Sequence, residues 1–363
     1  MNKMNAPKLR TDLHQVAAYA PSLAALSEHQ QIFGLAANES PYPPLPSVAE
    51  AIIEAAARAN RYPQSTDKGI GPVLAASLGA DSEELVFGAG SVEVISQLIR
   101  ATAAAGDEII FPWPSFDAYP LLAVAAAARP VKVPLTPGFG HDFEQMLSAI
   151  TPRTRLIIVC NPNNPTGTTV AASELNEFIA RVPEQILILI DEAYVQFNRE
   201  IDQPHGAELF RRHGNVVVAH TFSKAYGLAG LRIGYALAPL AVARAMRKVS
   251  IPFGVSDIAQ AAALASLDAE HELNQRIDWV VAERERVALE LERLRLGVPA
   301  SQANFFWFPV GARNHEAAQC FKAHGVLVRS LDGLGVRVAL GDRRANDALL
   351  AGASSLAAQL SNS

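Results

Sequence analysis

Five short apolar runs, separated by stretches with helical spacing, constrain the fold of this chain more than any other feature. Each run is brief, rich in Val, Ile or Leu, and bounded by turn-forming residues, as is typical of parallel strands buried on both faces of a sheet. The alternation of such runs with helical stretches predicts an α/β fold whose central sheet is mostly parallel and sandwiched by crossover helices. The runs cover residues 85–87, 108–111, 156–160, 186–190 and 216–220, and the helical stretches include 92–104, 118–128 and 172–181.

Polar and turn-forming residues follow the end of each apolar run. In open α/β sheets, ligands bind outside the carboxyl ends of the strands. We therefore expect the five segments to converge on one pocket. In chain order the segments are GAGS, PWPSF, NPNNPTG, DEAY and TFSK.

The composition favours a small molecule as the ligand of this pocket. Of the 363 residues, 50% are hydrophobic and 18% are charged, which is enough for a buried core in about two domains. The net charge of -5 gives no general attraction to nucleic acid or to an anionic membrane. No apolar stretch is long enough to cross a bilayer. Cys160 and Cys320 lack the spacing of a zinc site or a disulfide framework, so we expect no metal and a cytoplasmic protein.

The pattern changes after residue 252, which predicts a smaller α+β domain at the C-terminus. A long amphipathic helix is expected over 257–294. Short strand-like pieces follow at 305–308, 326–329 and 336–339. We expect three parts, namely an N-terminal arm (1–36) that packs with the small domain, a large domain (37–252) and a small domain (253–363).

Lys224 lies just beyond the last of the five apolar runs. A lysine in such a place is partly desolvated, so its amine can lose a proton and attack an aldehyde. A surface lysine would be the ordinary interpretation of a lone lysine. However, the hydroxyls of Thr221 and Ser223 and the guanidinium of Arg232 are all suited to a phosphate, which favours a reactive Lys224.

Asp191 follows an entirely apolar run, where a carboxylate needs a cationic or hydrogen-bonding partner. A helix N-cap would explain this residue structurally. The functional alternative is a pyridinium nitrogen, because a carboxylate opposite that nitrogen keeps it protonated and preserves its capacity to accept electrons.

The segment GAGSVE precedes a predicted helix. The backbone N–H groups of Gly90 and Ser91 could therefore hold a phosphate at the helix N-terminus. Glu93 occupies the last position of what would be a GxGxxG motif, so a dinucleotide site is not expected.

The pattern SK-x-x-GLAGLR-x-G around Lys224 resembles the cofactor-lysine segment of the class I/II, fold-type I aminotransferases. The resemblance covers nearly the whole chain and is closest to the histidinol-phosphate aminotransferase branch, within it to aromatic amino-acid (phenylalanine) aminotransferases. It implies pyridoxal 5'-phosphate as the cofactor, held covalently by Lys224, and a homodimer with shared active sites. Other segments that carry it are LAANESPYPPLP, RYP, GSVE, PSFDAYP, NPNNPTG and DEAYVQF.

The resemblance also implies how individual residues contact the cofactor. Lys224 carries the proton shift, and Asp191 contacts the ring nitrogen. Tyr194 and Asn164 contact the phenolic oxygen, and Phe116 stacks on the ring, although turn formation would also explain the NPNNPTG segment and core packing would explain Phe116. The expected phosphate contacts are Gly90, Ser91, Thr221, Ser223 and Arg232, with Tyr62 reaching the phosphate of the other subunit.

Arg329 and Arg337 lie in or beside strand-like runs, where an unpaired charge is costly and an anionic partner is expected. The resemblance implies that Arg337 binds the substrate α-carboxylate. Arg329 matches the position that relatives acting on histidinol phosphate use for the substrate phosphate. Asn38 and Asn304 are the other substrate-binding residues that the resemblance implies.

Three departures from typical histidinol-phosphate enzymes remove polarity or reach near the substrate. They are Val92, Phe116 and the short connection from Arg329 to Arg337. We therefore predict a transaminase that converts phenylalanine or tyrosine and 2-oxoglutarate into the aromatic keto acid and glutamate. The alternative is histidinol-phosphate transamination in histidine biosynthesis. A decarboxylase of an amino-acid phosphate and a non-catalytic binding protein remain further alternatives, although the intact cofactor set argues against the latter.

Overall fold

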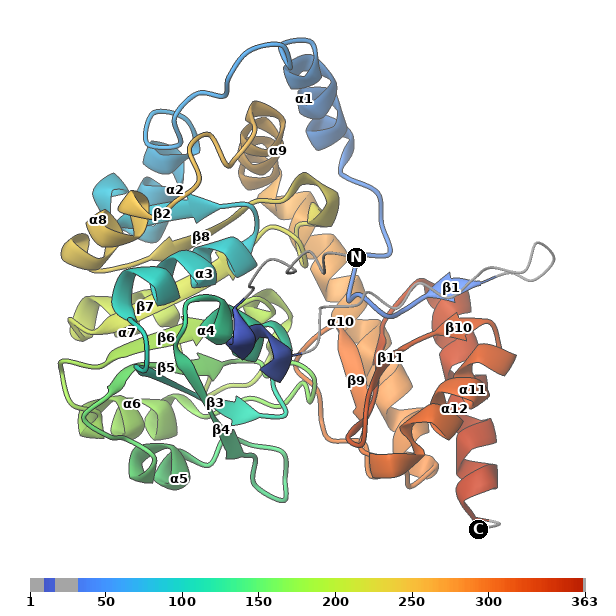
Figure 1. The fold of residues 1–363 in the computed structure, drawn as a ribbon. Helices are drawn as coiled ribbons and strands as arrows, with labels where there is room; N and C mark the ends of the chain where they lie inside the picture. The colour runs from blue at the N-terminus through green and yellow to red at the C-terminus, as the bar shows by residue number, and fades with distance from the viewer. Residues whose placement is uncertain (1–9, 17–31, 362–363) are drawn as a thin grey trace, which may run out of the picture.

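The computed structural model describes residues 10–16 and 32–361, and a seven-stranded sheet forms its largest layer (Figure 1). The strand order of this large sheet is β2-β8-β7-β6-β5-β3-β4. Strand β8 pairs antiparallel with β2 and β7, and the other neighbouring strands pair in parallel. The strands are β2 (Leu85–Gly88), β3 (Glu108–Trp113), β4 (Arg129–Pro134), β5 (Thr154–Cys160), β6 (Leu187–Asp191), β7 (Val216–Thr221) and β8 (Gly234–Leu237).

The prediction of a mostly parallel α/β sheet is confirmed, and each of the five apolar runs overlaps a strand. Strands β4 and β8 were not expected. The sequence RPVKVP of β4 is only partly buried, which fits the edge position of this strand. Because it does not form a continuous apolar run, the sequence pattern did not predict it.

Both faces of the large sheet are buried, because successive side chains of a strand point to opposite faces. In β5, Leu156 and Ile158 belong to one hydrophobic cluster, and Ile157 and Val159 belong to the other. The helices in this part of the chain are α1 (Pro46–Ala56), α2 (Ile70–Leu78), α3 (Ser91–Thr102), α4 (Ala118–Ala125), α5 (Phe143–Ser148), α6 (Ala172–Arg181), α7 (Gly206–Arg212) and α8 (Leu240–Lys248). Short 3₁₀ turns are η1 (Thr11–Gln15), η2 (Ser82–Glu84), η3 (Val195–Phe197) and η4 (Ala229–Leu231).

The single helix expected over 257–294 is wrong, because two helices occupy this stretch. They are α9 (Asp257–Asp268) and α10 (Glu270–Arg293), and the chain leaves helical geometry between them at Ala269, with φ -99° and ψ 32°. The break lets α9 pack against α1, while α10 runs on to the C-terminal part of the molecule (Figure 1). Helical periodicity continues across Ala269, so the sequence pattern did not reveal the change of direction.

The C-terminal part contains a small sheet with the order β11-β12-β9, in which neighbouring strands are antiparallel. The strand expected at 326–329 is divided between two sheets, because β10 (Val326–Leu327) pairs with β1 (Phe33–Gly34) instead. The other C-terminal elements are β9 (Phe305–Phe308), η5 (Gly311–Arg313), α11 (Asn314–Ala323), β11 (Arg329–Leu331), β12 (Gly335–Ala339) and α12 (Arg343–Ser361).

The predicted N-terminal arm (1–36) lies mostly outside the described residues, which omit 1–9 and 17–31. Of its described pieces, β1 pairs with β10, and η1 lies against α4. The boundaries expected after residues 36 and 252 stay predictions. No helix among the described residues is both long and apolar enough to cross a membrane.

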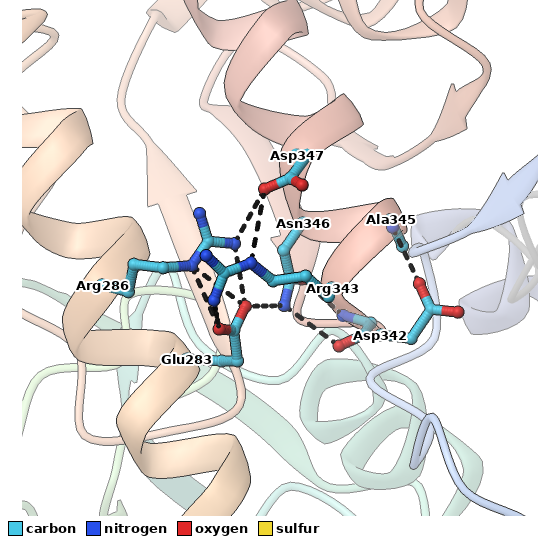
Figure 2. A network of polar contacts seen from close by, with 8 residues as sticks. Glu283, Arg286, Asp342, Arg343, Ala345, Asn346 and Asp347 are labelled. Carbon is cyan, nitrogen blue, oxygen red and sulfur yellow. Dashed lines mark hydrogen bonds and ion pairs between the residues drawn. The ribbon is translucent and has the colours of Figure 1, made fainter.

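A buried carboxylate joins α10 to the start of α12 (Figure 2). Glu283 is 5% exposed and forms ion pairs with Arg286 at 2.8 Å and with Arg343 at 2.7 Å. Asn346 also donates to Glu283 at 3.0 Å, and its side-chain oxygen accepts the N–H of Gly341 at 2.8 Å. The network thereby fixes the turn that directly follows β12.

Candidate active site

The carboxyl ends of β5, β6 and β7 and the start of α3 open onto one cavity of about 520 Å³. Its polar lining comes from both sheets, since the residues of the large sheet face Arg337 of the small sheet. The structure thus brings together most of the site residues expected from the sequence. Those that line the cavity are Asn38, Ser91, Phe116, Asn164, Asp191, Tyr194, Thr221, Ser223, Lys224, Arg232 and Arg337.

Lys224 lines this cavity, and its Nζ donates to the carbonyl oxygen of Ala37 at 2.9 Å. Burial and, to a smaller extent, the positive charges of Arg337 and Arg232 lower the pKa of this amine to about 7, against the opposing effect of Glu39. A large fraction of the amine is therefore neutral at pH 7. A neutral amine is the form that attacks an aldehyde and that accepts a proton.

Asp191 is the last residue of β6 and is 3% exposed. Its Oδ2 accepts a hydrogen bond from the Tyr119 hydroxyl at 2.6 Å, and its Oδ1 accepts one from Ala193 N at 3.3 Å. Burial raises the pKa of this carboxyl, and the hydrogen bond from Tyr119 opposes that rise. The N-cap interpretation is wrong, because the next helical turn begins only at Val195, with Tyr194 at its N-cap. A cationic ring nitrogen is a suitable partner for such a carboxylate.

Tyr119 is a residue of this site that the sequence analysis missed. Its side chain is fully buried in the first turn of α4, where its ring contacts Phe116 edge-on with the centroids 5.5 Å apart. The available signal was a tyrosine within the apolar segment AYPLLAVA, because a buried tyrosine hydroxyl requires a hydrogen-bonding partner.

The end of the cavity at the start of α3 has the features of a phosphate site. Helix α3 begins at Ser91, and Gly90 at its N-cap has φ 84°, a left-handed conformation that glycine adopts without strain. The Arg232 guanidinium lies so close to Gly90 that a Cβ atom there would collide with it. Arg232 Nη1 also donates to Ser223 Oγ at 3.3 Å, and the hydroxyl of Thr221 is buried beside it. A helix N-terminus, two hydroxyls and a guanidinium together suit a dianionic phosphate.

Arg337 of β12 forms the facing wall and is 9% exposed. Its Nη2 donates to the carbonyl oxygen of Ala36 at 2.6 Å, and its Nη1 donates to Asn164 Oδ1. Because the Asn164 oxygen is used in this way, the Asn164 amide N–H groups point elsewhere and can serve another acceptor. Both of these contacts are with neutral oxygens.

Asn38 and Tyr194 complete the lining between the two walls. Asn38 Nδ2 donates to the Tyr194 hydroxyl at 3.0 Å, and Asn304 Nδ2 donates to the carbonyl oxygen of Asn38 at 3.3 Å. Asn304 therefore supports Asn38 and does not itself line the cavity. The Asn38 Oδ1 atom is buried and has no hydrogen-bond partner among the described residues, so a bound ligand with an N–H group would satisfy it.

Two further residues expected at the site lie outside the cavity. Tyr62 is 80% exposed, and its ring stacks on Phe253 with the centroids 4.6 Å apart. Arg329 forms an ion pair with Asp117 at 2.5 Å. Gly90 lies directly behind the cavity wall, next to Arg232.

These residues fit pyridoxal phosphate. Lys224 supplies an amine of lowered pKa, Asp191 a buried carboxylate, and the start of α3 a phosphate site. Across the described ranges, no group of three or more His, Cys, Asp or Glu side chains could hold a metal ion.

Comparison with known proteins identifies the family. Residues 30–350 match the family model described as Aminotransferase class I and II. An aromatic amino acid aminotransferase of Streptomyces coelicolor is 49% identical over 345 residues, which cover 95% of this chain and 96% of the relative. An aromatic amino acid aminotransferase of Rhodococcus jostii is 49% identical over 353 residues, covering 97% of each chain.

Solved structures show the same fold. A histidinol-phosphate aminotransferase from Sinorhizobium meliloti, solved in complex with pyridoxal-5'-phosphate, superposes with a TM-score of 0.86 at 26% identity, covering 99% of this chain and 100% of that one. A Thermus thermophilus aspartate aminotransferase variant superposes with a TM-score of 0.82 at 22% identity, covering 97% of this chain and 100% of that one. The fold is thus that of the fold-type I pyridoxal-phosphate enzymes, and the chain belongs to the class I and II aminotransferases.

Proposed function

We propose that this aminotransferase uses pyridoxal phosphate to transfer the amino group of phenylalanine or tyrosine to 2-oxoglutarate. The observation that carries the proposal is the convergence of Lys224, Asp191 and Arg337 on one cavity beside a phosphate site. A reactive amine, a buried carboxylate and a guanidinium suited to a carboxylate are the groups that such a reaction requires.

Pyridoxal phosphate, when bound, supplies the electron sink that stabilises negative charge at the substrate α-carbon. The Asp191 carboxylate would keep the pyridine nitrogen protonated, and the Tyr194 hydroxyl would contact the phenolic oxygen. Lys224 Nζ, whose pKa is about 7, would take up and return the proton that moves during amino transfer. Arg337 would orient the substrate α-carboxylate from the opposite wall.

The preference for aromatic substrates is supported by the apolar side chains of the cavity. Val92, Phe116, Leu121 and Leu122 all line it. Apolar walls favour a phenyl ring, whose burial is stabilising in proportion to its area. Relatives between 44% and 49% identical to this chain are named aromatic amino acid aminotransferases, which supports the same assignment.

We also propose that the protein is a homodimer and acts in the cytoplasm. The exposed rings of Tyr62 and Phe253 support an interface, because stacked aromatic side chains at a surface commonly mark contact sites. The two cysteines, Cys160 and Cys320, are both free, as is usual in a reducing compartment.

A panel of amino donors tests the substrate assignment. Phenylalanine, tyrosine and histidinol phosphate would each be supplied with 2-oxoglutarate, and the products, a keto acid or a phosphorylated ketone, identified by mass spectrometry. We expect phenylpyruvate or its hydroxylated counterpart as the main product, together with glutamate. A clear preference for histidinol phosphate would assign the protein to the alternative activity, and carbon dioxide release without keto-acid formation would indicate a decarboxylase.

A further inference from the structure

Asp117 forms an ion pair that its position in the sequence does not predict. It directly precedes α4, a place where an aspartate usually accepts a hydrogen bond from the first turn of the helix. Its side chain makes no such bond. Instead, its Oδ2 lies 2.5 Å from Arg329 Nη2, and the two side chains are only 27% and 17% exposed. The carboxylate is therefore directed at Arg329 and not at its own helix.

The ion pair lies immediately behind the cavity, at its junction with the small sheet. Phe116 and Ala118, the neighbours of Asp117, both line the cavity. Arg329 is the direct partner of Arg337 in the antiparallel pair of β11 and β12. Side chains of directly opposed residues project from the same face of a sheet about 5 Å apart. Arg329 therefore projects on the same side as Arg337, which itself lines the cavity.

We propose that Asp117 is a specificity-determining residue that holds Arg329 in an ion pair, so that the substrate side-chain pocket rejects a phosphorylated side chain. This inference rests on the proposed function, since it concerns how the same site discriminates between donors. Asp117 acts through Arg329 and is a positioning residue.

The discrimination follows from charge. With Asp117 ionised, the pair is neutral overall, and a phosphate that approached Arg329 would have to displace a carboxylate already in place. A phosphate carries about -1.5 to -2 charges at pH 7, so it would also be repelled by Asp117 at short range. A phenyl ring presents no charge to either residue and meets only the apolar wall of Val92, Leu121 and Leu122.

The test compares Asp117→Asn with the parent enzyme on paired donors that differ only in the phosphate, namely histidinol phosphate and histidinol. Asparagine keeps the size of the side chain but cannot neutralise Arg329. We expect the ratio of kcat/KM for histidinol phosphate to that for histidinol to rise roughly tenfold or more, since a hydrogen bond to a charged group is worth about 1.5–3 kcal/mol. The change should appear mainly in KM, while phenylalanine turnover changes little.

Three further variants separate this effect from a general disturbance. Asp117→Glu keeps the charge and should restore the low parental ratio. Glu144→Gln removes the carboxylate of an exposed ion pair with Arg181, remote from the cavity, and should leave the ratio unchanged. In an Arg329→Ala background, Asp117→Asn should no longer raise the ratio, because the released guanidinium is gone. A rise that persists without Arg329 would overturn the proposed role of the ion pair.

The two proposals fail in different ways. A parent enzyme that transfers no amino group from phenylalanine or tyrosine would contradict the proposed function. Calorimetric titration of the parent and Asp117→Asn proteins with histidinol phosphate and with histidinol tests the inference independently of turnover. If the ratio of the two affinities is the same in both proteins, Asp117 does not determine specificity.

Discussion

The two walls of the cavity are constructed differently. The cofactor wall consists of strand ends of the large sheet, and the hydrogen bonds of its buried carboxylate and its phosphate site, from Tyr119 to Asp191 and from Arg232 to Ser223, stay within that sheet and its helices. On the facing wall, which is the substrate wall, Arg337 of the small sheet is held by distant parts of the chain. Arg337 bonds to the carbonyl of Ala36, which is 301 residues away in the sequence. Cofactor binding and substrate selection should therefore respond to different substitutions.

The largest expected effect lies at the cofactor wall. Lys224→Ala should abolish covalent attachment of pyridoxal phosphate and reduce turnover by at least roughly 10²–10⁴-fold, the usual contribution of a general acid–base group. Borohydride reduction followed by peptide mass spectrometry measures the attachment, and steady-state kinetics measures turnover. Lys132→Ala, a change on β4 where the lysine lies over the Trp113 ring, is the matched control and should retain both. Turnover near the parental rate in Lys224→Ala would rule out its proposed role.

Arg337→Ala should produce the next largest effect, a loss of kcat/KM that arises from weaker substrate binding and not from weaker cofactor binding. Both amino donor and acceptor carry an α-carboxylate, and truncating one partner of a buried charged pair costs roughly 2–5 kcal/mol, or tens to thousands of fold in kcat/KM. Cofactor affinity, measured by absorbance titration, should change much less. Arg329→Ala is the comparison and should affect phenylalanine little, since Arg329 lies outside the cavity. The assignment fails if phenylalanine turnover survives Arg337→Ala but collapses in Arg329→Ala.

Tyr119→Phe tests the hydrogen bond beneath the cofactor wall. Because the Tyr119 hydroxyl opposes the burial that raises the Asp191 pKa, its removal should raise that pKa further. Asp191 is then protonated at a higher pH on acidification, so the acid limb of the kcat/KM profile should move to higher pH. Loss of this buried hydrogen bond should lower the free energy of unfolding by about 1–3 kcal/mol. The absorbance of the bound cofactor against pH provides a second measurement.

Tyr235→Phe is the control for that shift, because Tyr235 is a buried tyrosine of β8 that does not line the cavity. The acid limb of the kcat/KM profile of Tyr235→Phe should coincide with that of the parent enzyme. An unshifted acid limb in Tyr119→Phe would show that the hydroxyl does not influence Asp191.

The smallest effect on chemistry should come from Glu283→Gln, which weakens the network behind the substrate wall (Figure 2). Burial raises the Glu283 pKa, but hydrogen bonds from Arg286, Asn346 and Arg343 outweigh it and hold the pKa below its ordinary value. The carboxylate therefore contributes stability above its unfolded-state pKa, and this contribution is lost as pH falls through the lower folded-state pKa.

We expect Glu283→Gln to lower the free energy of unfolding by about 1–3 kcal/mol at pH 7 and by less near pH 4, measured by urea unfolding. The KM for phenylalanine should rise slightly, and cofactor absorbance should stay as in the parent. Glu290→Gln removes a more exposed ion pair with Arg293 on the same helix. It should change neither the free energy of unfolding nor the KM for phenylalanine. Equal losses of stability at both pH values would exclude the ionised carboxylate as the cause.

Local sequence patterns predicted the large sheet better than the C-terminal part. Buried strands such as β5 and β6 can be predicted because their residues form continuous apolar runs. The edge strand β4 is only partly buried and lacks that signal. Strand β8, with the sequence GYAL, is buried but contains neither Val nor Ile. In the C-terminal part, the amphipathic pattern continued through Ala269, although the chain turns there to place α9 against α1.

The sequence by itself determined the fold class, the aminotransferase family and most of the residues that converge on the cavity, because strand ends, turn motifs and the segments that resemble the family are all encoded by neighbouring residues. Tertiary structure alone decided which groups those residues meet. The hydrogen bond from Tyr119 to Asp191 and the ion pair of Asp117 with Arg329 join residues 72 and 212 positions apart. Such pairs carry no local periodicity, and they form only because burial deprives each polar group of water and leaves the partner supplied by the fold.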